Sequence, residues 1–471
     1  MMAHGKLQIG WARTDITPLR KTLVLGQFRT RISDEVLNPL TATALALEVR
    51  DGDGGTEQAV IISCDLAICT FKNDLLQALD GRCPDLDAQK ITLSCTHTHT
   101  GPATDSGFYD EPEDDPEFLC PDEYRGWLAA QLADLVETAW AKRTPGSLSR
   151  GFAYATVGHC RRAVYADGTG LMYGDTNRPD IRGLESCSDP SVNMLFTRGP
   201  AGELTGMLVN LACTSQCQEH MSVFSADYWH HVREAIAERH GDGVHLLPQC
   251  APAGDMSPHL LYDKTEEADL RNRLGVDKCG IITRRIMAAV DEGLATASPP
   301  EETLTFAHEV ATWQLPRMMV TQEEYELEKS IYHMSEEERA QQHYAFQKIW
   351  RFGDVCELIS RYENQGEKPT QEMESHVIRL GDVVFATNAF ELYVDYAMRI
   401  RSRSRALQTF LVQIADGCGF YLPTQRALDH GHYSAQIKSC WVGPEGGQRL
   451  VDNTVAAIDR LFADEDYPKT R

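Results

Sequence analysis

Segments typical of buried β-strands alternate with segments typical of helices along most of this chain, and the alternation limits the folds open to it. EQAVIISCDLAI (57–68) and QKITLSC (89–95) are short apolar runs rich in β-branched residues, as buried strands are. From about Asp122 the apolar residues recur three and four apart, which predicts an amphipathic helix. Further strand-like segments lie at 202–213, 244–250, 376–388 and 407–417, and further helix-like segments at 225–241, 276–296 and 390–402. The sequence therefore predicts an α/β fold in which mixed β-sheets are flanked by helices.

The sequence also indicates where some helices begin. Ser225 is the expected N-cap of its helix, because a serine hydroxyl accepts a hydrogen bond from an early backbone N–H. TQEE (321–324) and SEEE (335–338) have the capping-box pattern within a charged helical stretch. No internal repeat and no low-complexity linker divides the chain. We therefore expect a single catalytic domain over residues 1–471 with a helical insertion at about 321–365, which either caps a pocket or has a purely structural role.

The charge balance disfavours several kinds of partner. The chain of 471 residues has a formal net charge of −24, with 69 acidic residues against 45 basic ones. Nucleic-acid binding relies on lysine and arginine to neutralise phosphates, and anionic membrane surfaces attract the same residues. No segment approaches the roughly 18 consecutive apolar residues of a membrane span, and the opening residues contain no signal-like apolar run.

The cysteines indicate a reducing compartment. There are 14 of them, scattered and without a CxxC pair, which favours reduced thiols over a disulfide framework. The sequence therefore predicts a cytoplasmic protein with no nucleic-acid partner and no stable membrane association, and it leaves the oligomeric state open.

Two histidines follow the strand at 89–95. SCTHTHTGPA (94–103) places His97 and His99 two residues apart, and residues two apart on an extended chain face the same side. Two neutral imidazoles at a strand end suit Zn²⁺. In the alternative, one histidine donates to a backbone carbonyl and the other is solvated.

Two further loops after strands carry oxygen-bearing side chains. In APAGDMSPHL (251–260), Ser257 and Asp255 either belong to a site or stabilise a tight turn. In NAFELYVDY, Glu391 is either a carboxylate metal ligand or the partner of Asn388 in a capping box.

Two more segments offer aromatic and basic groups. Tyr421 and Tyr433 lie in a glycine-rich loop, where tyrosines either pack or contribute to a site. In VGHCRRAVY, one of the adjacent Arg161 and Arg162 either forms a buried ion pair or binds an anionic or carbonyl group of a substrate.

In their order along the chain, these segments resemble the neutral/alkaline (non-lysosomal) ceramidase family, specifically its catalytic N-terminal region. The similar segments are IGWARTDITP, IISCDL, LSCTHTHTGPA, VGHCRRAVY, SDPSVNMLFTR, LVNLAC, FSADYW, PAGDMSP, NAFE and GFYLPT…GHYSA. They cover most of residues 8–435, and THTHTGP, SADY and GDMSP are the more specific among them. The resemblance marks the chain as a divergent member.

The resemblance implies a zinc-dependent amidase. His97, with His99 beside it, Glu391 and Tyr421 match the residues that hold zinc in that family. Ser257 and Arg161 match its active-site serine and arginine.

One zinc ligand of the family pattern is replaced. The family's second histidine follows a strand in a position that Thr214 occupies here. Either the site has lost this ligand, or Gln216, Glu219 or His220 of the same loop replaces it, and Glu219 and His220 are chemically the better zinc ligands.

The expected reaction is hydrolysis of an amide, or an ester, in a small polar soluble substrate by metal-activated water. His99 would move a proton or orient the nucleophile, Arg161 and Tyr433 would stabilise the oxyanion, and Ser257 would hold the water or the substrate. Two alternatives stay open: a metal-dependent lyase or isomerase acting on a sugar-like metabolite, and a metal-binding protein that has lost catalysis.

Overall fold

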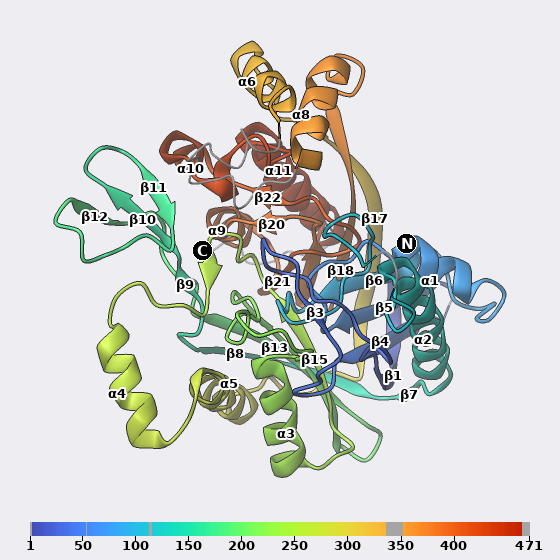
Figure 1. The fold of residues 1–471 in the computed structure, drawn as a ribbon. Helices are drawn as coiled ribbons and strands as arrows, with labels where there is room; N and C mark the ends of the chain where they lie inside the picture. The colour runs from blue at the N-terminus through green and yellow to red at the C-terminus, as the bar shows by residue number, and fades with distance from the viewer. Residues whose placement is uncertain (1, 53, 113–114, 336–351, 464–471) are drawn as a thin grey trace.

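The structure is a computed structural model that describes residues 2–52, 54–112, 115–335 and 352–463 (Figure 1). Its larger sheet has the strand order β21-β19-β18-β17-β1-β4-β5-β6, with β7 paired to β1. The strands are β1 (Met2–Asp15), β4 (Thr41–Arg50), β5 (Thr56–Cys64), β6 (Ile91–Cys95), β7 (Thr144–Pro145), β17 (Thr303–Pro316), β18 (Thr370–Leu380), β19 (Val383–Thr387) and β21 (Gln408–Val412). The pairs at the two ends of this order, β5 with β6 and β19 with β21, are parallel.

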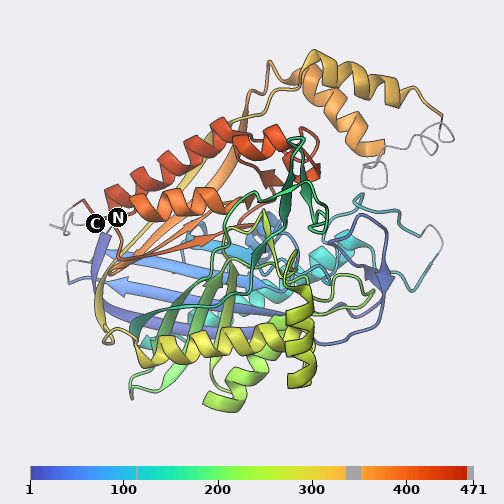
Figure 2. The same ribbon diagram turned by 90° about the vertical axis from the view of Figure 1, so that its left-hand side faces the viewer.

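A smaller sheet packs against the larger one. Its strand order is β15-β14-β13-β8, from β8 (Ser147–Tyr154), β13 (Ser191–Arg198), β14 (Leu204–Leu211) and β15 (His245–Cys250). Here β14 and β15 form a parallel pair. Figure 2 shows the two sheets stacked face to face, with helices on the outer side of each.

The layers are held together by apolar side chains that face each other. Leu45 and Leu47 of β4 meet Leu208 of β14 and Leu247 of β15 in the core between the sheets. On the outer faces, α1 (Lys72–Leu79) and α2 (Pro121–Ala141) cover β4 to β6, α9 (Val394–Arg403) and α11 (Pro444–Leu461) cover β17 to β19, and α3 (Tyr228–His240) and α5 (Lys278–Ala295) cover the smaller sheet. Both faces of each sheet are therefore buried, which explains why β4 and β5 read as nearly continuous apolar runs.

Smaller elements extend from these layers. They are the strand pairs β2 (Thr22–Leu23) with β3 (Ile32–Ser33), β9 (His159–Cys160) with β16 (Met256–Ser257) and β20 (Glu391–Leu392) with β22 (Tyr421–Leu422), the sheet of β10 (Arg162–Tyr165), β11 (Gly170–Met172) and β12 (Ile181–Leu184), and the helices α4 (Lys264–Leu274) and α10 (Gln425–His430). None of the described helices combines the length and the hydropathy that crossing a membrane requires.

The predicted fold class is confirmed, with two local corrections. Ser225 is not the N-cap of α3; Asp227 is, and its carboxylate accepts a hydrogen bond from the N–H of Tyr228. The single strand expected at 376–388 is the end of β18 followed by β19, because the chain reverses at Gly381, whose φ is +57°.

A helical hairpin leaves the body between β17 and β18. It consists of α6 (Gln322–Tyr332) and α8 (Phe352–Asn364), and the rings of Tyr325 and Tyr362 stack 4.3 Å apart between them. The capping box expected at Thr321 is present. The SEEE pattern falls mainly on residues 336–338, which lie outside the described residues. Figure 2 shows the hairpin projecting from the layered body.

Truncating a side chain between the sheets tests how much this core contributes. Leu208 is fully buried there, so we expect Leu208→Ala to lower the free energy of unfolding by about 2–5 kcal/mol, because it removes apolar contacts and leaves a cavity. Urea unfolding of the purified protein measures the change. The control is Leu19→Ala at a residue that is 80% exposed, and a similar loss in both variants would contradict the assigned core.

The first residue of β15 makes stability depend on pH. The ring of His245 stacks on Trp11 at 5.6 Å, and burial lowers the pKa of His245 to about 4, with a further contribution from the charge of Arg13. An unfolded chain binds this proton near its ordinary pKa of about 6.5. Stability from neutral His245 is therefore fully present above about pH 6.5 and is lost as the pH falls toward about 4.

We expect His245→Gln to reduce the loss of unfolding free energy between about pH 7 and about pH 5, because glutamine does not titrate in this range. Urea unfolding at the two pH values gives the comparison, with His220→Gln at an exposed histidine as the control. An unchanged pH dependence in His245→Gln would show that this ring does not contribute.

Candidate metal centre and active site

The candidate site lies where parallel strands end. The chain runs from β6 into His97, from β14 into Thr214 and Glu219, from β15 into Ser257, from β19 into Glu391 and from β21 into Tyr421. Backbone contacts join these exits: Thr98 bridges to Ser215, and the N–H of Gly254 donates to the carbonyl of Leu392 at 2.9 Å. The carboxyl ends of parallel strands commonly form such sites.

The two histidines meet, although not in the way that the sequence predicted. His97 has a positive φ of 57°, so the chain is not extended through His99. The turn nevertheless brings the rings together, with centroids 4.9 Å apart and the two Nε2 atoms 3.4 Å apart. The prediction that the two histidines share one face of an extended strand is therefore wrong. Their rings are nevertheless close together.

His99 is held as a neutral ring. Its Nδ1 lies 3.3 Å from Oε2 of Glu219, which can only accept a hydrogen bond, so the proton belongs on Nδ1. Burial lowers the pKa of His99 to about 4, against the raising effect of Glu219. The lone pair of His99 is consequently on Nε2, which faces His97.

His97 presents a second lone pair to the same point. Its Nδ1 lies 2.7 Å from the carbonyl oxygen of Ala67 and donates to it, which leaves Nε2 unprotonated in the neutral ring. That Nε2 lies 3.5 Å from Oε2 of Glu391. Nε2 of His97 therefore lies close to two other hydrogen-bond-accepting atoms, Nε2 of His99 and Oε2 of Glu391, an arrangement that a cation stabilises, either a further proton or a metal ion.

Glu391 and Tyr421 are brought together by a short parallel ladder. They are register partners in the pair β20 and β22. Burial raises the pKa of Glu391, but a proton on Nε2 of His97, which would donate to Glu391, and the charge of Arg161 outweigh it and lower that pKa. The capping-box alternative is wrong, because α9 begins at Val394 and the Asn388 side chain accepts from the N–H of Phe390.

Arg161 lies fully buried beside this carboxylate. Its guanidinium donates to the hydroxyl of Tyr173 at 2.8 Å and to the carbonyl of Gly254 at 2.9 Å, and lies 4.0 Å from Glu391. Its Nε is buried and has no hydrogen-bond partner among the described residues. Arg162 instead forms a buried ion pair with Glu185 at 2.6 Å, so the ion-pair alternative applies to Arg162.

In the loop after β14, the side-chain amide of Gln216 lies against the ring of His99. The hydroxyl of Thr214 donates to Oε1 of Gln216, which directs the amide nitrogen to 3.1 Å from both ring nitrogens of His99. An amide N–H₂ donates hydrogen bonds and does not bind metal. His220 is exposed, and across the described residues no hydrogen bond or ion pair links its imidazole to this cluster.

The carboxylate of Glu219 forms hydrogen bonds and an ion pair with the surrounding side chains. Its Oε2 accepts from the amides of Gln27 at 3.0 Å and Gln216 at 3.1 Å, and its Oε1 lies 2.8 Å from Nε2 of His259. Burial raises the pKa of Glu219, while the hydrogen bonds from His259 and His99 lower it further than burial raises it. With both oxygens occupied, Glu219 orients His99 rather than offering a free ligand atom.

Several neighbours were missed from the sequence. His259 accepts from Nζ of Lys278, and its ring lies 5.7 Å from that of Tyr173. The available signal was the position of His259, two residues after Ser257 in a loop that already looked like a site. Lys278 and Tyr173 carried no such signal, because each comes from a distant segment.

The remaining predicted residues line the same region. The Ser257 hydroxyl is buried and accepts from the N–H of His259 at 3.1 Å. The ring of Tyr433 lies 6.1 Å from that of Tyr421, and burial raises the pKa of Tyr433.

These donors are of the kind that zinc binds. His97, Glu391 and Tyr421 offer nitrogen and oxygen atoms, the ligand types of zinc sites in enzymes. Among the described residues, three groups of His, Cys, Asp or Glu place one ligand atom each within 4.8 Å of one another, and all three lie elsewhere: Cys217, Asp227 and Cys279; His230, His231 and Glu234; Glu374, His376 and Asp416. The ligand atoms around His97 therefore approach each other in pairs, and they do not form a group in which every atom lies within 4.8 Å of the others.

No protein-family model matches the chain, and no curated protein sequence matches it. A crystal structure of neutral ceramidase from Pseudomonas aeruginosa superposes with a TM-score of 0.66 over 97% of this chain and 75% of that chain, at 15% sequence identity. The chain has the fold of neutral ceramidase. A ceramidase complexed with C2 matches with a TM-score of 0.64 at 15% identity, covering 97% of this chain and 76% of that one. The resemblance found in the sequence is thereby confirmed for the fold.

A glycine packed against His99 provides a test of the site's geometry. Gly26 has a φ of +110°, and a Cβ there would lie 2.6 Å from the backbone and ring of His99. Gly81 also has a positive φ, +73°, but nothing lies within 4 Å of its would-be Cβ. Both alanine variants carry the left-handed penalty of about 1–2 kcal/mol, and only Gly26→Ala adds a clash.

We therefore expect Gly26→Ala to destabilise the protein more than Gly81→Ala, and to raise the pKa of His99 toward its ordinary value as the ring is displaced toward water. Urea unfolding and NMR titration of His99 measure the two effects. Equal losses of stability, with an unchanged His99 titration, would contradict the packing described.

Proposed function

We propose that the protein is a metal-dependent hydrolase, with zinc as the metal, that cleaves an amide or an ester bond in a small polar substrate. The observation that carries this proposal is the position of Nε2 of His97, which lies 3.4 Å from Nε2 of His99 and 3.5 Å from Oε2 of Glu391, on the fold of a neutral ceramidase. We take the whole chain, 1–471, as one catalytic unit.

His97, Glu391 and Tyr421 would hold the zinc ion, with Nε2 of His99 next to it. When bound, zinc lowers the pKa of a water molecule toward about 7 and polarises a carbonyl group. The hydrogen bond from Nδ1 of His97 to Ala67 fixes the ring in the orientation that metal-ligating histidines need. Glu219 does the same for His99, and for that reason we prefer it as an orienting residue over a direct ligand.

The other side chains would bind and orient the substrate. The Nε of Arg161, which has no hydrogen-bond partner in the described part of the chain, would offer a charged donor to the oxygen on which negative charge develops. The hydroxyl of Tyr433 would add a second donor from the opposite segment of the site. Neutral His99 would take a proton from the attacking water, since its low pKa keeps it unprotonated at about pH 7. Ser257 would hold the substrate by its hydroxyl.

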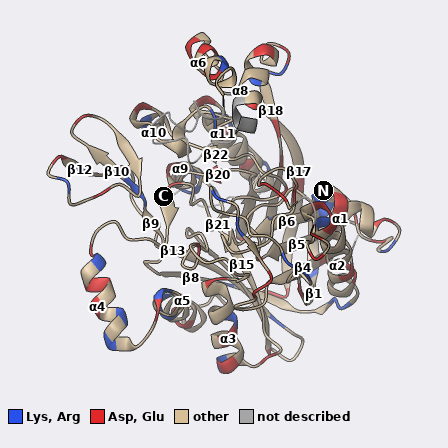
Figure 3. Ribbon diagram, viewed as in Figure 1, with Lys and Arg blue, Asp and Glu red and all other residues tan. Residues whose placement is uncertain are grey.

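Several features support a small polar substrate in the cytoplasm. The site is lined by polar and charged side chains, and acidic and basic residues are interspersed on the exposed helices α4 and α6 (Figure 3). The cysteines are free thiols, as is usual in a reducing compartment. The α6–α8 hairpin contacts the segment of Tyr433 through Lys438, which lies 2.7 Å from Glu328, so we assign it to the border of the site.

The zinc role of His97 and Glu391 is tested by metal content and turnover together. We expect His97→Ala and Glu391→Gln to lose bound zinc and to reduce turnover of an amide or ester library by more than about 100-fold, the upper end for residues that only support ligands. Metal analysis and initial rates measure both effects, with His220→Ala as the control. Wild-type turnover in zinc-depleted His97→Ala would refute the assignment.

The bond broken is tested with ¹⁸O-labelled water, because hydrolysis must place label in the carboxylate product. Product without label would indicate the lyase or isomerase alternative. Zinc-loaded protein that turns over no amide or ester would support a metal-binding protein without catalysis.

A further inference from the structure

We propose that Cys217, Asp227 and Cys279 form a second metal site, distinct from the candidate centre at His97, for a thiolate-binding ion such as Zn²⁺. The proposal does not rest on the catalytic function. It concerns a buried group next to the loop that contacts His99.

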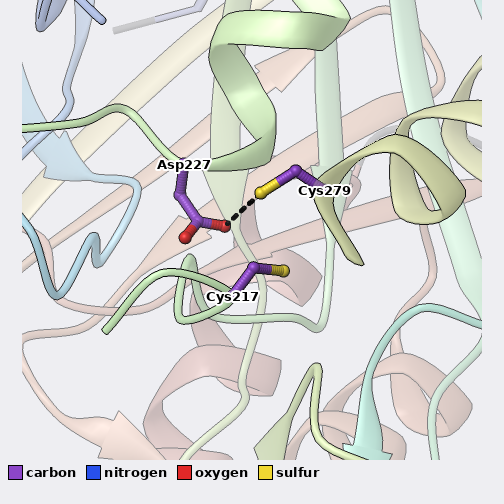
Figure 4. A group of neighbouring side chains, drawn as sticks. All are labelled: Cys217, Asp227 and Cys279. Atoms are coloured by element: carbon purple, nitrogen blue, oxygen red, sulfur yellow. Dashed lines mark hydrogen bonds between the residues drawn. The ribbon is translucent and has the colours of Figure 1, made fainter. Parts of the chain in front are cut away.

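The three side chains are arranged around a common point (Figure 4). One ligand atom from each lies within 4.8 Å of the others, and Sγ of Cys279 lies 3.9 Å from Oδ1 of Asp227. Zinc bonds of about 2.0–2.3 Å in tetrahedral geometry separate neighbouring ligand atoms by about 3.3–3.8 Å. Only a small contraction of the observed group is therefore needed to surround an ion.

The ligands come from three separate elements. Cys217 lies in the loop after β14, Asp227 is the N-cap of α3, and Cys279 is in the first turn of α5. Three protein ligands leave one of the four positions around zinc for a water molecule. An ion here would tie the loop to the starts of both helices that cover the smaller sheet.

Burial and charge also favour a cation. Cys217 is 8% exposed, Asp227 is 0% and Cys279 is 1%. A buried carboxylate normally pairs with a cationic group, yet within the described part of the chain Asp227 forms no ion pair. Its oxygens accept from the N–H groups of Tyr228 and Gln218, and Oδ1 also accepts from the thiol of Cys279, whose proton a metal ion would replace.

The other two candidate groups do not carry the same inference. At Glu374, His376 and Asp416, Nζ of Lys72 contacts Glu374 and lies 2.9 Å from Asp416, so a cation is already present. His230, His231 and Glu234 lie within two turns on the outer side of α3, where they are partly or fully exposed.

The ion would stiffen one wall of the candidate active site. Cys217 directly follows Gln216, whose amide contacts His99, and Cys279 directly follows Lys278, which donates to His259. Holding Cys217 and Cys279 on one ion fixes these two neighbours relative to each other. The role we assign is structural: the site positions side chains and does not bind substrate.

Cobalt substitution separates the two metal sites in the full-length protein. Co²⁺ bound by thiolates gives an intense ligand-to-metal charge-transfer absorption, whereas a centre of histidine, carboxylate and tyrosine lacks thiolate bands. We expect this absorption in the wild type and in His97→Ala, and its loss in Cys217→Ser and Cys279→Ser. The matched control is Cys64→Ser, a buried thiol outside the group, which should retain it.

X-ray absorption at the zinc edge of the unmutated, zinc-loaded protein gives a test that does not depend on the folding of variants. We expect sulfur neighbours at about 2.3 Å. Zinc with only nitrogen and oxygen neighbours, or a Cys217–Cys279 disulfide found by mass spectrometry, would overturn the proposal. A spectrum without sulfur neighbours would say nothing against zinc at the His97 centre. Failure of the second metal site and failure of the proposed hydrolase are therefore distinguishable.

Discussion

The structure depends on the burial of both faces of two stacked sheets. Leucines of β4 meet leucines of β14 and β15 between the sheets, while helices cover the outer faces. Because the sheets cannot slide without exposing these residues, the ends of β6, β14, β15, β19 and β21 stay at one region of the molecule. The candidate site is a consequence of that packing, since no single segment carries it.

The same packing explains how much of the site was predictable. His97, Glu391 and Tyr421 follow strands whose apolar pattern is visible in the sequence, so their positions at strand ends were expected. His259 and Lys278 were missed because the contact of His259 with Glu219 and that of Lys278 with His259 arise only when distant segments meet. Sequence patterns report local periodicity, whereas such contacts depend on tertiary packing.

Local backbone conformation accounts for the other differences between the sequence predictions and the structure. The alternation of side chains predicted a shared face for His97 and His99, but a left-handed His97 replaces the extended chain. Similarly, Asp227 rather than Ser225 caps α3, although both residues are good capping types. Residue type indicated a helix start, and only the tertiary fold selected which of the two would serve.

The hairpin of α6 and α8 has a different relation to the fold. It is inserted between β17 and β18, which are already neighbours paired in register from Phe306 and Leu380 to Pro316 and Thr370. The entropy of closing a connection grows slowly with its length, so an element placed there adds little strain to the sheet. This junction is consequently a natural grafting point, where a helical element can be lengthened, shortened or exchanged beside the Tyr433 segment while the two-sheet body keeps its register.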